Sequence, residues 1–242
     1  MLLSDRMKAV ADLVLPCESM ADIGCDHGYV AIALIRNGIC KKVIAMDINK
    51  GPLERAKGNI RDCKMQDFIE TRLSDGAAAL LPNEADGLIC AGMGGRLVIS
   101  ILKQRREIVH KMKQLVLQPQ SELNEVRSYL RQNGYRIEKE DMIFEDGKYY
   151  PMMRVSPMPE TAGEECTETS ERIVRVQDTY GPYLLEKSNP VLKQYLLWQK
   201  DNLENIMGNL KNTRSITARQ QERIAELDEQ LGDIVFCLYH YF

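Results

Sequence analysis

The chain has 242 residues, 44% of them hydrophobic and 28% charged, which suits one core domain with an appendage and excludes a disordered chain. The formal net charge of −3 argues against a uniformly basic nucleic-acid-binding protein, but it conceals a split. Residues 1–159 carry 23 Lys+Arg against 21 Asp+Glu, and residues 160–242 carry 9 against 14. The seven cysteines form no CxxC pair, so we expect no disulfide framework and no metal, and a reducing cytoplasm fits best.

The first half of the chain alternates short apolar runs with longer amphipathic ones, the pattern of βα repeats in a parallel sheet. A lead-in helix is expected over 7–15. Strands follow at 19–23, 42–47, 68–73, 87–91 and 114–118, with helices at 28–38, 51–64, 94–109 and 121–133. No apolar stretch is long enough to span a bilayer and no secretory leader is apparent, so we expect a soluble protein with no membrane partner.

After Gly134 the pattern changes to strands at 135–139, 142–145 and 149–155. Asp146-Gly147 separates the last two, and Asp-Gly between alternating apolar residues is a strong hairpin signal. The sequence therefore predicts a doubly wound α/β sheet followed by an antiparallel hairpin.

Residues 156–170 contain Pro157, Pro159 and Gly163 and indicate a linker, which divides the chain into domains 1–158 and 159–242. Beyond the linker, apolar residues recur at steps of three and four in two stretches separated by the polar run 211–217. This pattern predicts an antiparallel coiled-coil hairpin or, equally, the core face of a small helical domain.

A glycine-rich turn follows the first strand, in Asp22-Ile23-Gly24-Cys25-Asp26-His27-Gly28. Such a turn lets the backbone approach a ligand closely, although an ordinary βα turn is the alternative. A dinucleotide fingerprint needs a second glycine where Asp26 stands, and an acid there would repel a pyrophosphate. Asp26 would instead suit a cationic group, such as the amino group of methionine.

Acids and glycines also follow the next three predicted strands, at the sheet edge where open α/β sheets bind ligands. Asp47 can accept hydrogen bonds from ribose hydroxyls and Asp75 from the adenine amine, although each alone could be a cap or loop residue. Together they predict an S-adenosylmethionine site built from Asp22, Gly24, Asp26, Gly28, Asp47, Ile48, Ser74, Asp75, Gly76, Ala91, Gly92 and Met93.

The chain resembles the bacterial tRNA (adenine-22-N1)-methyltransferases, the TrmK family, over nearly its whole length. The resemblance is carried by Leu3-Ser4-Asp5-Arg6-Met7, Asp22 to Tyr29, Ala91-Gly92-Met93-Gly94-Gly95, Leu117-Gln118-Pro119 and Tyr180-Gly181-Pro182-Tyr183-Leu184-Leu185. It implies a class I, Rossmann-like methyltransferase sheet with an antiparallel terminal hairpin and a C-terminal helical coiled coil. It also implies S-adenosylmethionine as methyl donor and N1 of an adenine in tRNA as acceptor.

The expected chemistry needs alignment more than a base, because N1 of adenine keeps an in-plane lone pair at neutral pH. N1 lies on the pairing edge, so the base has to be exposed or flipped into a pocket. Asp26, His27 and Tyr29 are the catalytic candidates: a carboxylate could accept from N6 and an aromatic ring could stack on the base. Asp26 fits a cofactor or an acceptor role, and the cofactor or shared role is favoured. His27 could instead be a loop residue and Tyr29 a packing residue.

The residues 96–113 are rich in Lys and Arg with a single acid, which predicts contacts with tRNA phosphates or, alternatively, a solvated helix face. The predicted substrate-binding residues are Arg6, which could instead form a structural salt bridge, and Gly94, Gly95, Arg96, Arg105 and Arg106.

Three other functions are compatible with parts of this pattern. A nicotinamide-dependent dehydrogenase would require the glycine that Asp26 replaces. A non-catalytic RNA-binding or interaction protein could keep the fold and work through its helical tail. A methyltransferase could also act on a different nucleic acid. We expect a monomer.

Overall fold

The computed structural model describes residues 3–158, 170–211 and 217–242. The chain divides into two compact units, Met1–Cys166 and Thr167–Phe242, which are described separately below. The predicted linker 156–170 lies mostly outside the described residues, as does most of the predicted polar turn 211–217.

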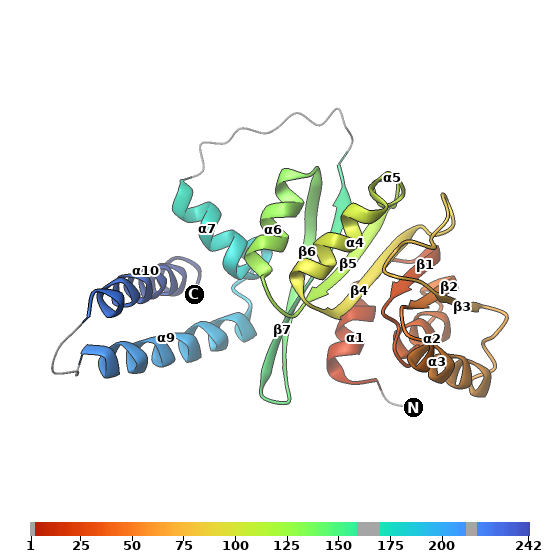
Figure 1. Ribbon diagram of the computed structural model, residues 1–242, viewed down its shortest axis with the longest axis horizontal. Coiled ribbons are helices and arrows are strands. Elements are labelled where there is room, and N and C mark those ends of the chain that lie inside the picture. Colours follow the sequence, from red (N-terminus) through yellow and green to blue (C-terminus); the bar gives the residue numbers. More distant parts are fainter. Residues whose placement is uncertain (1–2, 159–169, 212–216) are drawn as a thin grey trace. The chain divides into compact units, whose positions relative to one another are not determined.

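The first unit is built on one seven-stranded sheet with the order β3-β2-β1-β4-β5-β7-β6 (Figure 1). The first five strands are parallel, and β7 runs antiparallel to both β5 and β6. The doubly wound sheet and its antiparallel hairpin are thereby confirmed. The strands are β1 (Cys17–Ile23), β2 (Cys40–Asp47), β3 (Ile69–Leu73), β4 (Gly87–Met93), β5 (Gln114–Pro119), β6 (Tyr135–Glu145) and β7 (Lys148–Pro157).

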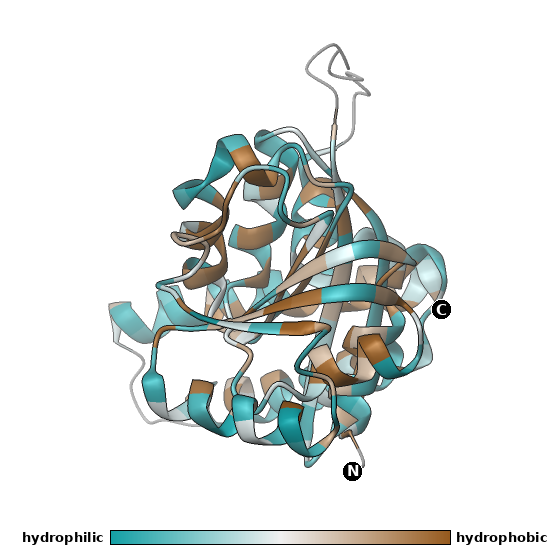
Figure 2. Ribbon diagram, turned by 90° about the vertical axis from the view of Figure 1, so that its right-hand side faces the viewer, coloured by the Kyte–Doolittle hydropathy of each residue, from teal (hydrophilic) through white to brown (hydrophobic). Residues whose placement is uncertain are grey.

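Helices cover both faces of this sheet because its central strands are apolar on both sides. One core lies between the sheet and α1 (Asp5–Asp12), α2 (Tyr29–Arg36) and α3 (Lys50–Asp62). The other lies beneath α4 (Gly95–Gln104), α5 (Arg106–Val109) and α6 (Leu123–Gln132). Figure 2 shows hydrophobic residues along the strands and on helix surfaces facing them. Burial of these two apolar layers stabilises the sheet and fixes its carboxyl edge.

Two predicted elements differ from the structure. The predicted helix 94–109 is divided into α4 and α5 at Arg105, whose backbone angles of φ −130° and ψ 46° are not helical. The predicted strands 135–139 and 142–145 form the single strand β6, which bends at an irregularity between Ile137 and Lys139. The pattern of apolar residues in the sequence indicated neither the break at Arg105 nor the continuity of β6.

The second unit is helical in its described parts, as predicted. It contains α7 (Glu171–Tyr180), α8 (Pro182–Glu186), α9 (Pro190–Lys211) and α10 (Ala218–Tyr241), with α9 packed against α10. Buried Asp233 of α10 accepts hydrogen bonds from Arg175 Nε at 2.7 Å and Arg172 Nε at 3.1 Å, which fastens α7 to α10. No described helix in either unit has the length and apolar character that crossing a membrane requires.

A buried ion pair joins α6 to the hairpin. Arg127 Nε lies 2.8 Å from Glu140 Oε1, and the two side chains are 2% and 0% exposed. We predict that Arg127→Met lowers the free energy of unfolding by about 3–5 kcal/mol, because it leaves the Glu140 charge buried without its guanidinium. Urea denaturation measures this loss. The control Arg131→Met, at an exposed position of the same helix, should change stability by less than about 1 kcal/mol. Equal losses in both variants would contradict the assignment.

Candidate active site

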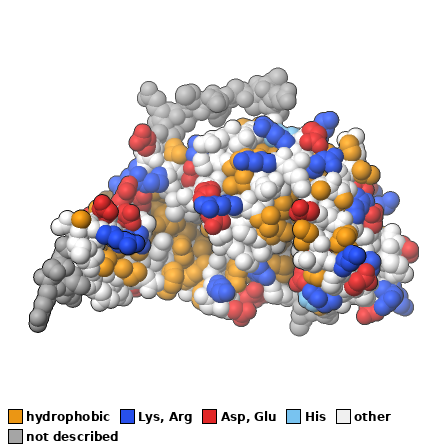
Figure 3. Space-filling model, viewed as in Figure 1, with side chains coloured by type: hydrophobic (Ala, Val, Ile, Leu, Met, Phe, Trp, Pro, Cys, Tyr) orange, Lys and Arg blue, Asp and Glu red, His pale blue; other side chains and the backbone are white. Residues whose placement is uncertain are grey.

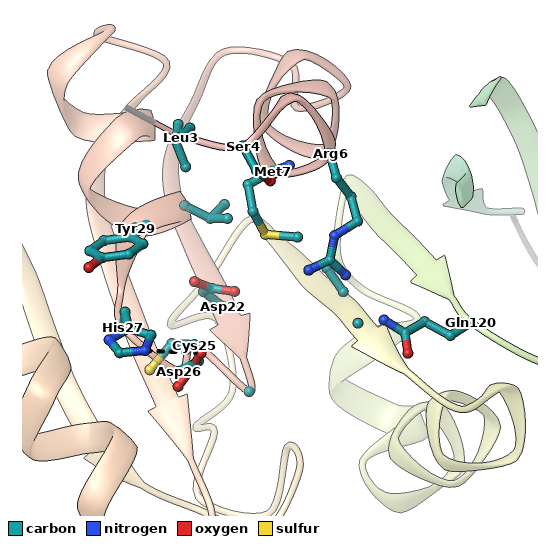
Figure 4. Close-up of a pocket in the computed structure, with 14 residues that line it drawn as sticks. Leu3, Ser4, Arg6, Met7, Asp22, Cys25, Asp26, His27, Tyr29 and Gln120 are labelled. Atoms are coloured by element: carbon teal, nitrogen blue, oxygen red, sulfur yellow. Dashed lines mark hydrogen bonds and ion pairs between the residues drawn. The ribbon is translucent and has the colours of Figure 1, made fainter. Parts of the chain in front are cut away.

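A cavity of about 510 Å³ lies where the carboxyl ends of β1 and β4 meet the start of α1 (Figure 4). Neighbouring strands whose connections leave in opposite directions create such a crevice in open α/β sheets. The cavity is lined by Leu3, Ser4, Arg6, Met7, Asp22, Gly24, Cys25, Asp26, His27, Tyr29, Val30, Ala91, Gly92 and Gln120.

The turn after β1 forms the cavity floor and depends on left-handed backbone conformations. Gly24 has φ +72°, Asp26 φ +46° and Gly28 φ +71°. The amides of Gly24 and Cys25 both donate to Met46 O of β2, at 2.8 and 2.9 Å. The positive φ of Gly24 favours glycine at this position, and the Met93 methyl group lies where a Cβ would stand.

Asp22, the buried acid at the end of β1, has an incomplete set of hydrogen bonds. It is 4% exposed, and its Oδ2 has no hydrogen-bond partner in the described structure. Burial, with a smaller contribution from the charge of Asp47, raises the pKa of the Asp22 carboxyl to about 7. An unpaired buried carboxylate is costly, so this position fits a ligand that brings a positive charge or hydrogen-bond donors.

The three predicted catalytic residues lie together on one side of the cavity. Asp26 Oδ1 accepts a hydrogen bond from Arg55 Nη2 at 3.3 Å, and Oδ2 lies 3.5 Å from His27 Nε2. The His27 and Tyr29 rings are stacked, with centroids 5.2 Å apart and planes 15° from parallel. The Asp26 side chain is 62% exposed, so its carboxylate is accessible to a ligand.

Arg6 belongs to the other side of the cavity, where it joins α1 to β5 and the hairpin. Its Nη1 donates to Gln118 Oε1 at 3.3 Å, and its guanidinium lies over the Tyr150 ring, 5.0 Å from the centroid. Gln118 is fully buried, and the same oxygen accepts from the Gly92 amide at 3.1 Å. Gln118 therefore fixes both Arg6 and the loop after β4.

The predicted residues at the ends of β2 and β3 lie on the same sheet edge but do not line the cavity. Asp47 Oδ1 accepts from the Asn49 amide at 2.8 Å, and the neighbouring Ile48 is 58% exposed. Ser74 caps the next turn, because its hydroxyl donates to Gly76 O at 2.8 Å. Asp75 is exposed. The apolar side chain of Ile48 and the acidic side chains of Asp47 and Asp75 thus lie at or just after the ends of β2 and β3, at this edge of the sheet.

The predicted substrate-binding residues other than Arg6 are outside the cavity lining. Gly94 and Gly95 start α4, where a Cβ on Gly95 would overlap Ser121 O, so this glycine serves helix packing. Arg96 pairs with Glu125 at 2.9 Å, and Arg105 pairs with Glu107 at 2.9 Å. Within the described residues Arg106 is exposed and has no ion pair. Figure 3 shows both charge signs interspersed over the first unit.

Several functional positions are absent from the sequence prediction. Leu3, Ser4 and Met7 line the cavity beside Arg6, and the motif at the chain's start was the signal for them. Gln120 follows the buried strand β5, so its place at the carboxyl edge was foreseeable. No signal marked Arg55, since it occupies an ordinary helical position on α3.

The sheet with its antiparallel final pair and the glycine-rich cavity define a methyltransferase domain. Residues 3–153 match the family described as "Methyltransferase domain". The chain is 26% identical to the tRNA (adenine(22)-N(1))-methyltransferase of Bacillus subtilis, over 95% of this chain and 94% of that one. It is 35% identical to a putative tRNA methyltransferase of Mycoplasma pneumoniae, over 74% of this chain and 80% of that one.

Solved structures agree with these sequence matches. The B. subtilis m1A22 tRNA methyltransferase TrmK superposes with a TM-score of 0.82, at 26% identity, over 98% of this chain and 99% of that one. The putative tRNA (m1A22) methyltransferase of Streptococcus pneumoniae in complex with S-adenosyl-L-methionine gives 0.83, at 26% identity, over 98% and 100%. The chain belongs to the TrmK family of methyltransferases.

The environment of Asp22 yields a direct prediction. In the ligand-free protein the Asp22 carboxyl should titrate near pH 7, and Asp47→Asn should lower its pKa, because a like charge beside a carboxylate disfavours ionisation. Carbon-13 NMR of labelled aspartate, assigned through Asp22→Asn, measures both values. Asp75→Asn, at the next strand end, is the control that should leave the titration unchanged. An Asp22 pKa near 3.8, the ordinary value for an aspartate, would contradict this account of the site.

Proposed function

We propose that this protein transfers a methyl group from S-adenosylmethionine to N1 of adenine 22 in tRNA. The observation that carries the proposal is the buried carboxyl of Asp22, which lacks a partner for Oδ2 in a cavity beside a glycine-rich turn. The B. subtilis relative, whose name states this activity and which matches 95% of this chain, supports the choice of acceptor.

The residues present fit S-adenosylmethionine at this edge of the sheet. Asp22 offers an unsatisfied acceptor for the amino group of the methionine part, and Gly24 lines the cavity beside it. Asp47 can accept from ribose hydroxyls, while exposed Ile48 and Asp75 offer an apolar surface and an acceptor for the adenine of the cofactor. The remaining proposed cofactor contacts come from Asp26 or backbone near it and from Gly28, Ser74, Gly76, Ala91, Gly92 and Met93.

When bound, S-adenosylmethionine supplies a methyl group on a positively charged sulfur. The chain's own residues align the acceptor base and stabilise the positive charge that the base gains as its N1 lone pair forms the new bond. We assign Asp26 a shared role: besides its cofactor contact, its exposed carboxylate can accept from N6 of the acceptor while Arg55 holds it in place. The stacked His27 and Tyr29 rings offer an aromatic surface for the base.

The proposed contacts with tRNA outside the cavity come from cationic side chains. Arg106 is exposed and without an ion pair among the described residues, so its guanidinium is available to a phosphate. Arg6 borders the cavity and could meet the backbone beside the flipped base. Gly94, Gly95, Arg96 and Arg105 are retained as weaker proposals. We propose that the protein acts as a monomer, and a tRNA substrate favours the cytoplasm.

The experiment that tests the proposed function is incubation of the protein with unmodified tRNA and methyl-labelled S-adenosylmethionine, followed by mapping of the methylated atom. The expected product carries the label on N1 of adenine 22 and disappears when that adenine is replaced by guanine. Label on another nucleotide would contradict the acceptor. Cofactor binding without incorporation into any tRNA would favour a non-catalytic RNA-binding protein.

Binding affinities of variants test the proposed division between cofactor-binding and tRNA-binding residues. Asp47→Ala and Asp75→Ala should each weaken S-adenosylmethionine binding by about tenfold or more, because each removes a charged hydrogen-bond acceptor. Calorimetry measures this. Arg106→Ala should leave cofactor affinity unchanged, weaken tRNA binding, and lower the slope of log affinity against log salt by about 1.

The matched control for the tRNA arm is Arg61→Ala, an exposed arginine on α3. It should keep the wild-type salt slope. Wild-type cofactor affinity in both aspartate variants would contradict the assignment of the strand-end acids, whatever the tRNA result.

A further inference from the structure

Gln120 presents a free amide on the side of the cavity opposite Asp22 and Asp26 (Figure 4). It follows the last residue of β5, and its backbone amide donates to Met93 O at 2.8 Å, which fixes the start of the side chain. Its Nε2 lies 3.8 Å from where a Cβ on Gly92 would stand. The side chain is exposed and makes no hydrogen bond within the described residues, so both its donor and its acceptor are available to a ligand.

The chemistry of the proposed acceptor restricts how adenine can be recognised. N1 has to keep its lone pair for the incoming methyl group, so no protein donor can occupy it during attack. The neighbouring Hoogsteen edge still identifies adenine, because it presents N7 as an acceptor beside N6–H as a donor. A side chain that reads this edge needs one donor and one acceptor in a plane, which is what an amide provides.

The other polar side chains around the cavity do not place a donor and an acceptor side by side in one plane. Arg6 has donors only, and ionised Asp22 and Asp26 have acceptors only. The two ring nitrogens of His27 point in different directions, and Tyr29 offers a single hydroxyl. The Ser4 hydroxyl already accepts the Met7 amide at 3.2 Å as the cap of α1. Gln120 carries the one amide side chain among the residues that line the cavity in the described structure.

We infer that Gln120 is a specificity-determining residue that binds the Hoogsteen edge of the target adenine. Its Oε1 accepts from N6–H and its Nε2 donates to N7, which leaves N1 unobstructed and the second N6–H directed towards Asp26. Guanine presents acceptors at both O6 and N7, so its O6 would oppose Oε1 and guanine would be rejected. This inference rests on the proposed function, since it takes adenine as the methyl acceptor.

The test uses tRNA that carries 7-deazaadenine at position 22, in which a C–H group replaces N7 and cannot accept a hydrogen bond. For the wild type, kcat/KM should fall about 5- to 10-fold on this substrate relative to ordinary tRNA, the range expected for one lost hydrogen bond. Gln120→Leu, which keeps the approximate size of the side chain, should be about 10-fold slower on ordinary tRNA and show no further loss on the 7-deaza substrate. Gln120→Glu, which keeps the acceptor and loses the donor, should likewise be insensitive to the substitution.

The matched control is Gln132→Leu, an exposed position on α6 whose amide bonds to Ser128 of the same helix at 3.2 Å. It should discriminate between the two substrates as the wild type does. Equal rates of the wild type on both substrates, or an unchanged 7-deaza loss in Gln120→Leu, would overturn the inference and leave the proposed function intact. A wild type that fails on ordinary tRNA would instead remove the proposed function and this inference together.

Discussion

The site depends on a carboxyl group that the fold buries and leaves only partly satisfied. Asp22 is the next-to-last residue of β1, which lies between parallel strands β2 and β4, and its side chain is buried. Desolvation and the nearby Asp47 raise the pKa of this carboxyl to about 7. A protein gains nothing in stability from such a group, so its presence in the cavity supports the proposed cationic ligand.

The two sides of the cavity differ in what they can offer a ligand. One side contributes the carboxylates of Asp22 and Asp26 and the stacked rings of His27 and Tyr29. The opposite side contributes the guanidinium of Arg6 and the amide of Gln120. Buried Gln118 holds that opposite side together through Arg6 and the Gly92 amide. This asymmetry suits the proposed reaction, in which the acceptor base gains positive charge, because the carboxylates can stabilise that charge while the neutral amide of Gln120 binds another edge of the base.

The parts of the fold and site that the sequence predicted are those determined locally. Apolar runs identified the parallel strands, and Asp22 to Tyr29 could be assigned together because they are contiguous in one turn. The break at Arg105 was missed because its cause is tertiary: its guanidinium donates to Ala78 O at 2.9 Å, across a separation of 27 residues. Arg55 and Gln118 were missed for the same reason, since their partners Asp26 and Arg6 lie 29 and 112 residues away in sequence.

Proton release during cofactor binding tests the role of Asp22 most directly. With a pKa of about 7, the carboxyl is about nine-tenths protonated at pH 6, and it has to ionise to pair with a cationic amino group. Calorimetry of S-adenosylmethionine binding at pH 6, in two buffers of different ionisation enthalpy, should give release of close to one proton by the wild type. Asp22→Asn should release almost none. The absence of proton release by the wild type at pH 6 would contradict the account.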